Sequence, residues 1–283
     1  LILDFSLDNT TYQDKYVTFS SKIYTIIPGQ QELVAWLMVK SDAPPINASL
    51  TIDLKRGVFP HGLVGYWKFD EGTGIITFDS SENNNHGVLI NGPLWADGKY
   101  GKALGFDGVD DYVMIPDSQS LRVQSFTLVA WIYMTGRPYQ HSGDRHVAMV
   151  NKLHWLYGPA FGYKLDFEDP TSTDDYLVIA IGDGYAQRFL IRYNSINDLT
   201  LYEWHHVVGT FDGTIAKLYI DGELKSSSTP VTYTVANDDA PLGIGQEVTG
   251  SSGHFNGLID NVMIYNRALS AEEVQANYAG FIP

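Results

Sequence analysis

Hydrophobic and polar residues alternate along almost the whole chain with a period of two, which is the pattern of β-strands that bury one face. In the first 55 residues this pattern predicts four strands, each rich in β-branched and aromatic residues: Leu1–Leu7, Tyr16–Ile27, Glu32–Lys40 and Ala48–Lys55. Prolines and glycines separate the strands, as expected for turns. A short hinge at residues 57–62 follows, and we place the domain boundary there, giving domains at residues 1–58 and 59–283.

Beyond the hinge, strands recur at close intervals as far as residue 266, with Gly and Asp in the turns between them. Such spacing predicts an all-β fold, a two-sheet antiparallel β-sandwich or jelly roll, preceded by the small N-terminal β-sheet domain. One short C-terminal helix is also predicted. Ser270 and Glu273 have the spacing of a capping box, Leu269 can pack against Val274, and Gly280 can end the helix.

Charge narrows the range of partners. The formal net charge is −15 over 283 residues, and no basic stripe is visible, which argues against nucleic acid as a partner. Apolar runs such as Val34–Val39 are far too short to span a membrane. Acidic residues are 24 Asp and 9 Glu, a bias that suits turns and calcium sites.

Two features favour an extracellular protein. The chain begins at Leu1 rather than Met, as it would after removal of a signal segment. Asn9 and Asn47 each begin a glycosylation sequon, so the chain is expected to be a glycoprotein.

A series of short motifs runs in a fixed order through the second domain. They are GYWKFDEG (65–72), DSSENNNHG (79–87), GKALGFDG (101–108), DYV (111–113), FTLVAWI (126–132), WHHV (204–207), LYIDG (218–222) and GLIDNVMIYNRALS (257–270). The series resembles the LamG-like, concanavalin A-like lectin/glucanase jelly-roll superfamily over about residues 62–280. This resemblance implies two curved antiparallel sheets packed face to face.

The resemblance also implies a structural calcium ion held near the chain ends of the sandwich. Residue by residue, its ligands would be Asp260, Asp70, Glu71, Asp107 and Gly108. The alternative is that these residues only make turns and hold no ion.

Catalysis is not predicted. Related laminarinases carry Glu-x-Asp-x-x-Glu on one strand, and nothing here matches that pattern. Asp166, Glu168 and Asp169 are interpreted as a solvated turn, because Pro170 should end the strand. Adjacent strand residues point to opposite faces, so His205 and His206 are interpreted as structural rather than as a zinc pair. The chain is therefore expected not to be an enzyme.

Carbohydrate recognition is suggested by aromatic loops. Sugar sites combine exposed aromatic rings with planar polar groups. The candidates are Tyr139, Trp155, Tyr157, Tyr185 and Arg188. The alternative is ordinary packing of these side chains in the core or in loops.

The N-terminal domain has too few strands for a complete immunoglobulin-type sandwich. Its first strand, residues 1–7, could pair with a neighbouring subunit, or equally with its own chain. We therefore expect an extracellular surface or adhesion protein that self-assembles into a filament or layer. The alternative is a carbohydrate-binding module from a polysaccharide-degrading enzyme, whose partners would be surface glycans.

Overall fold

The computed structural model describes residues 2–7, 17–19, 37–39, 50–55, 61–136, 146–155, 158–168, 175–247 and 253–280. The chain divides into two compact units, residues 1–61 and residues 62–282. Asn9 and Asn47, the two predicted glycosylation sites, lie outside the described residues.

The first unit contains two pairs of antiparallel strands. β1 (Ile2–Leu7) pairs with β4 (Leu50–Lys55), and β2 (Val17–Phe19) pairs with β3 (Leu37–Val39). Each lies within one of the four predicted strands. Because β1 is hydrogen-bonded to β4 along its whole length, the structure adopts the intrachain alternative for this strand. Self-association stays a prediction.

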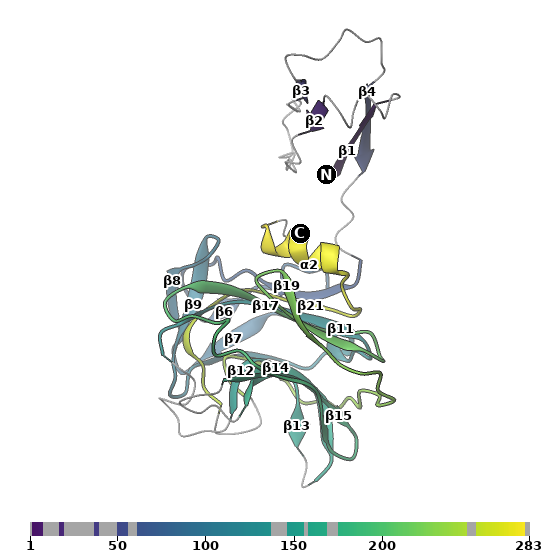
Figure 1. The fold of residues 1–283 in the computed structure, drawn as a ribbon. Coiled ribbons are helices and arrows are strands. Elements are labelled where there is room, and N and C mark those ends of the chain that lie inside the picture. Colours follow the sequence, from purple (N-terminus) through teal and green to yellow (C-terminus); the bar gives the residue numbers. More distant parts are fainter. Residues whose placement is uncertain are drawn as a thin grey trace. The chain divides into compact units, whose positions relative to one another are not determined.

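In the second unit the described strands form two antiparallel sheets stacked face to face (Figure 1). The nine-stranded sheet has the order β16-β15-β14-β12-β20-β10-β7-β6, and β13 pairs with β14 beside it. Its strands are β6 (Ile76–Thr77), β7 (Gly87–Ile90), β10 (Tyr112–Ile115), β12 (His146–Asn151), β13 (His154–Trp155), β14 (Ala160–Glu168), β15 (Tyr176–Asp183), β16 (Gln187–Asn194) and β20 (Leu242–Ile244).

The eight-stranded sheet has the order β19-β18-β17-β11-β21-β9-β8, and β5 pairs with β21. Its strands are β5 (Leu63–Trp67), β8 (Leu94–Asp97), β9 (Lys102–Asp107), β11 (Phe126–Met134), β17 (Trp204–Phe211), β18 (Ala216–Ile220), β19 (Glu223–Ser227) and β21 (Asn256–Tyr265). A 3-10 turn, η1 (Gln119–Leu121), precedes β11. The predicted all-β sandwich is confirmed.

The core lies between the two sheets, and alternate residues of each strand enter it. From β11 the core takes Phe126 and Leu128, and from β14 it takes Tyr163, Leu165 and Phe167. The rings of Phe126 and Tyr163 stack across the sandwich with their centroids 5.2 Å apart. The remaining residues of these strands therefore belong to the outer faces of the sandwich.

Helix α2 (Ala271–Tyr278) covers the outer face of the eight-stranded sheet (Figure 1). The predicted capping box is present, because the Glu273 amide donates to Ser270 Oγ and the Ser270 amide donates to the Glu273 carboxylate. Val274 is buried against Val129 and Val208 of the sheet. None of the described helices has the length and hydropathy needed to cross a membrane.

The two adjacent histidines of β17 have structural partners, as the sequence predicts. His206 Nε2 lies 2.8 Å from Asn277 Oδ1 of α2, and burial lowers its pKa to about 4. His205 Nδ1 instead lies 2.8 Å from Asp221 Oδ2. The two rings therefore serve different contacts and do not form a common metal site.

Candidate functional site

The structure brings together two of the five predicted calcium ligands. Asp260 lies in β21 and is fully buried, and the nearby Asp70 carboxylate follows β5. Burial, with the charge of Asp70 as a further contribution, raises the pKa of Asp260 to about 7. A cation between the two carboxylates would offset both effects.

The loop between β8 and β9 wraps over these two carboxylates. The Tyr100 amide donates to Asp260 Oδ2 at 3.0 Å, and the Lys102 amide donates to Asp70 Oδ1 at 2.8 Å. A Cβ on Gly98 would lie 2.5 Å from the Lys102 carbonyl oxygen and 2.7 Å from Asp260 Oδ2. The backbone at Gly98 therefore approaches both oxygens too closely for any side chain, and the Asp70 and Asp260 carboxylates are the candidate ligands of a hard cation here.

The other predicted ligands lie elsewhere. Glu71 Oε1 accepts hydrogen bonds from the Phe78 amide and from Thr77 Oγ1, so its side chain is directed toward β6. Asp107 pairs with Asn256, four residues before Asp260 on β21, and is therefore separated from Asp260 by about 13 Å along the strand. Gly108 follows Asp107 in the same turn.

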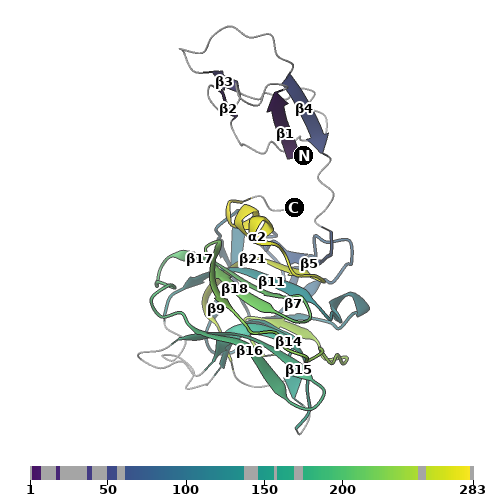
Figure 2. The same ribbon diagram turned by 45° about the vertical axis from the view of Figure 1, so that its right-hand side comes forward.

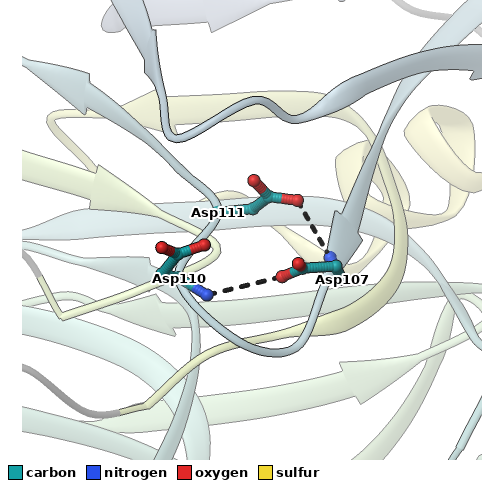
Figure 3. Close-up of side chains that lie close together, drawn as sticks. All are labelled: Asp107, Asp110 and Asp111. Atoms are coloured by element: carbon teal, nitrogen blue, oxygen red, sulfur yellow. Dashed lines mark hydrogen bonds between the residues drawn. The ribbon is translucent and has the colours of Figure 1, made fainter.

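Asp107 belongs instead to an acidic turn between β9 and β10 (Figure 3). Its carboxylate and those of Asp110 and Asp111 place ligand atoms within 4.8 Å of one another. Hydrogen bonds within the turn account for this arrangement. Asp107 Oδ1 accepts from the Val109 and Asp110 amides, and Asp111 Oδ2 accepts from the Asp107 amide.

The outer face of the nine-stranded sheet carries a buried charged cluster. On β14, Lys164, Asp166 and Glu168 alternate with the core residues and so share this face. The Lys164 ammonium group is 2.9 Å from Asp166 Oδ2 and also contacts Glu168 Oε1. All three residues are at most 3% exposed. The interpretation of Asp166 and Glu168 as a solvated turn was therefore wrong, because β14 continues to Glu168 before Pro170; Asp169 lies outside the described residues.

The two carboxyl groups of this cluster have opposite pKa shifts. Burial raises the pKa of Asp166, although Lys164 partly offsets this, and Asp166 Oδ1 has no hydrogen-bond partner in the described structure. The pKa of Glu168 is lowered, because hydrogen bonds from His146, Lys164 and Gln187 outweigh its burial. Keeping the Asp166 carboxyl ionised therefore costs folding free energy, whereas the Glu168 carboxylate is stabilised.

We expect Asp166→Asn to be more stable than the wild type by about 1 kcal/mol or more near pH 8. The folded pKa of Asp166 lies above its unfolded value, so the cost of ionising it is absent below about pH 4 and grows as the pH rises. The advantage of Asp166→Asn should therefore vanish near pH 4. Urea unfolding of both proteins across this range measures the difference, and equal stability at every pH would contradict the assignment.

The other end of the same outer face is apolar and aromatic. Trp155 of β13 pairs with Ala160 of β14, so both residues share this face. Leu153, Ala160 and Ala180 pack there as a cluster separate from the core. Across the sheet, Phe189 of β16 pairs with Ala180. Trp155 and Phe189 are each 48% exposed, so this end offers rings to solvent.

Strands β15 and β16 lie side by side (Figure 2), and Tyr185 belongs to the turn that joins them. The Gly184 amide donates to the Ala160 carbonyl at 2.9 Å, which places this turn beside the strand that pairs with Trp155. Tyr185 is 82% exposed. We call Trp155, Tyr185 and Phe189, together with Gln187 of β16, the aromatic patch.

The remaining predicted ligand residues have other positions. Arg188 donates to Asp183 Oδ2 at 2.6 Å, and its guanidinium group lies over the Tyr233 ring at 4.9 Å. Strand alternation directs Arg188 to the face opposite Gln187. Tyr139 and Tyr157 lie outside the described residues. Phe189 and Gln187 were missed in the sequence, although their spacing of two in QRFLIRYN indicates a shared face.

Two antiparallel sheets packed face to face define a β-sandwich of the jelly-roll class. The chain belongs to the concanavalin A-like lectin/glucanases superfamily, because the family model Laminin_G_3 matches residues 107–275. A search of curated proteins found no match.

Several solved structures share the fold. Domain 4 of an extracellular arabinanase from Geobacillus stearothermophilus, solved with arabinotriose, is 21% identical, with a TM-score of 0.58 over 77% of this chain and 98% of that domain. The binding domain of Paraclostridial Mosquitocidal Protein 1 is 17% identical, with a TM-score of 0.58 over 78% of this chain and 52% of that domain. The botulinum neurotoxin serotype G binding domain is 14% identical, with a TM-score of 0.59 over 77% and 51%. The chain spans about half the length of these toxin domains.

Proposed function

We propose that the second unit is a non-catalytic carbohydrate-binding module whose ligand stacks on the aromatic patch. The observation that carries this proposal is the exposure of Trp155, Tyr185 and Phe189 at one end of a sheet whose opposite face is fully packed. Exposed rings beside planar polar groups are the usual means of holding sugar rings. The arabinanase domain solved with arabinotriose supports the same class of ligand.

A binding role without catalysis is supported by the carboxyl groups on this face. Retaining glycosidases need two carboxyl groups that flank the substrate about 5–5.5 Å apart. Asp166 and Glu168 are buried, and both contact the Lys164 ammonium group. A bond to be hydrolysed has no access between them.

We further propose that the protein acts outside the cell, as a surface or adhesion protein, with glycosylation at Asn9 and Asn47. Support comes from the two sequons and from the extracellular arabinanase and toxin binding domains that share its fold. We also propose a structural calcium ion at Asp70 and Asp260, for which the geometry of the β8–β9 loop is the support.

Trp155→Ala should weaken binding to a recognised polysaccharide at least about tenfold, because it removes the largest exposed ring of the patch. Tyr185→Ala should act in the same direction. Affinity electrophoresis in gels containing single polysaccharides measures the change. The matched control is Phe78→Ala, because Phe78 is 54% exposed and follows β6 at the far end of the sheet order. Equal losses in Trp155→Ala and Phe78→Ala would contradict the proposed site.

A further inference from the structure

We propose that the aromatic patch recognises an uncharged polysaccharide and that Gln187 is the polar group that contacts its hydroxyls. This inference rests on the proposed carbohydrate-binding function and names the class of its ligand. Three features carry it: the pairing of the nearby cations, the negative net charge of the chain, and the fixed orientation of the Gln187 amide.

The described cations near the patch are all engaged by the protein itself. Lys164 is paired with Asp166 and Glu168, and Arg188 is paired with Asp183. The Arg192 guanidinium group lies 4.3 Å from the centre of the Tyr176 ring. Recognition of a carboxylate or sulfate group on a sugar needs an Arg or Lys that is available for a charge-assisted hydrogen bond. An acidic polysaccharide that used Lys164 or Arg188 would have to displace the carboxylate partners of that side chain.

The surrounding charge also opposes an acidic ligand. On the outer face the carboxyl groups of Asp166 and Glu168 are matched in number by the Lys164 and Arg192 side chains, so the patch has no excess of positive charge. The whole chain has a net charge of −15. A polyanion would therefore be repelled during its approach and would find no excess of cations at the patch.

Gln187 supplies the neutral polar group that sugar hydroxyls need. Its Nε2 donates to Glu168 Oε1 at 2.9 Å. A carboxylate only accepts hydrogen bonds, so the NH2 end of the amide must face Glu168, and this leaves the Gln187 carbonyl oxygen available to accept. Gln187 is half-buried and lies two residues from Phe189 on the same face. A hydroxyl of a sugar stacked on Phe189 would lie within reach of this oxygen.

The test is affinity electrophoresis and titration calorimetry of the full chain with four probes. Debranched arabinan and cereal β-glucan are uncharged, whereas polygalacturonate and heparin are acidic. We expect binding to at least one uncharged probe, with an affinity that changes less than about twofold between about 50 mM and about 500 mM salt. Binding to an acidic probe but to neither uncharged one would overturn this inference and leave the proposed carbohydrate binding intact. Binding to none of the four would overturn both.

Variants at residue 187 test the role of the amide. Gln187→Ala should weaken binding of the uncharged probe about tenfold. It should also lower the melting temperature modestly, because it removes one hydrogen bond to the buried Glu168, so binding is measured well below the unfolding transition. Gln187→Glu should weaken it at least as much, since it places a second carboxylate against Glu168. Unchanged affinity in both variants, with Trp155→Ala still defective, would remove Gln187 from the site.

Discussion

Replacing Lys164 with methionine is expected to destabilise the second unit by about 3–5 kcal/mol. Lys164 is 3% exposed, and it is the ammonium group that Asp166 and Glu168 share on the outer face of the sheet. Without it, two buried carboxyl groups would face each other with no lysine between them. Breaking a buried ion pair from one side costs far more than the pair contributes, because the remaining charge stays desolvated.

Tryptophan fluorescence in a urea titration would measure this loss, since five of the six tryptophans of the chain lie in residues 62–282. The matched control is Lys102→Met, because the Lys102 side chain is 48% exposed and pairs with the exposed Asp97 at 2.7 Å. That variant should lose less than about 1 kcal/mol. Adding Asp166→Asn and Glu168→Gln to Lys164→Met should recover most of the stability. A loss in Lys164→Met no larger than in the control would contradict burial of the cluster.

The sequence predicted the parts of this fold that depend on local patterns. Strand alternation and the Ser270–Glu273 box involve residues close together in the chain, so their physical causes are visible in the sequence itself. The same holds for the opposite directions of His205 and His206. The order of the strands within each sheet is not local and was not predicted; the family resemblance implied only two antiparallel sheets packed face to face.

The burial of the charged cluster was not predicted from the local pattern. The spacing of Lys164, Asp166 and Glu168 places them on one face of a strand, but it does not say whether that face is buried. Pairing of β14 with β12 and β15 decides this, because it places beside the cluster residues that are at least 8 positions away in sequence. The expectation that Pro170 makes this segment a turn was wrong, because a proline can follow a strand without shortening it.

For the candidate sites, too, the sequence predicted individual residues but not which of them lie close together. Trp155 and Tyr185 were predicted from aromatic content. They lie at one end of the sheet because Trp155 pairs with Ala160 and the amide of Gly184, which precedes Tyr185, donates to the Ala160 carbonyl. The five predicted calcium ligands came from the resemblance, and the pairing of β9 with β21 separates Asp107 from Asp260. Register, which no motif states, therefore determines which of these residues can act together.

Calcium is expected to stabilise the wild-type protein by about 2.7 kcal/mol at a free concentration one hundred times its dissociation constant. The expected ligands are Asp70 and Asp260, whose carboxylates lie under the β8–β9 loop with the Lys102 carbonyl oxygen beside Asp260. Asp260→Asn keeps the shape of the side chain and removes its charge, so it should abolish the calcium-dependent part of the stability. Melting temperatures measured with calcium and with a chelator, for both proteins, give the comparison.

The variant Asp110→Asn tests whether calcium binds at Asp70 and Asp260 or at the acidic turn of Asp107, Asp110 and Asp111. Asp107 and Asp111 accept amide hydrogen bonds within their own turn, whereas Asp260 is buried and lies near the charge of the exposed Asp70, which a cation would offset. Asp110→Asn should therefore respond to calcium as the wild type does. If calcium stabilised Asp260→Asn but not Asp110→Asn, the ion would belong to the turn. If it stabilised none of the three proteins, the amides of the β8–β9 loop would be sufficient to hold Asp70 and Asp260 together, and no ion would be needed.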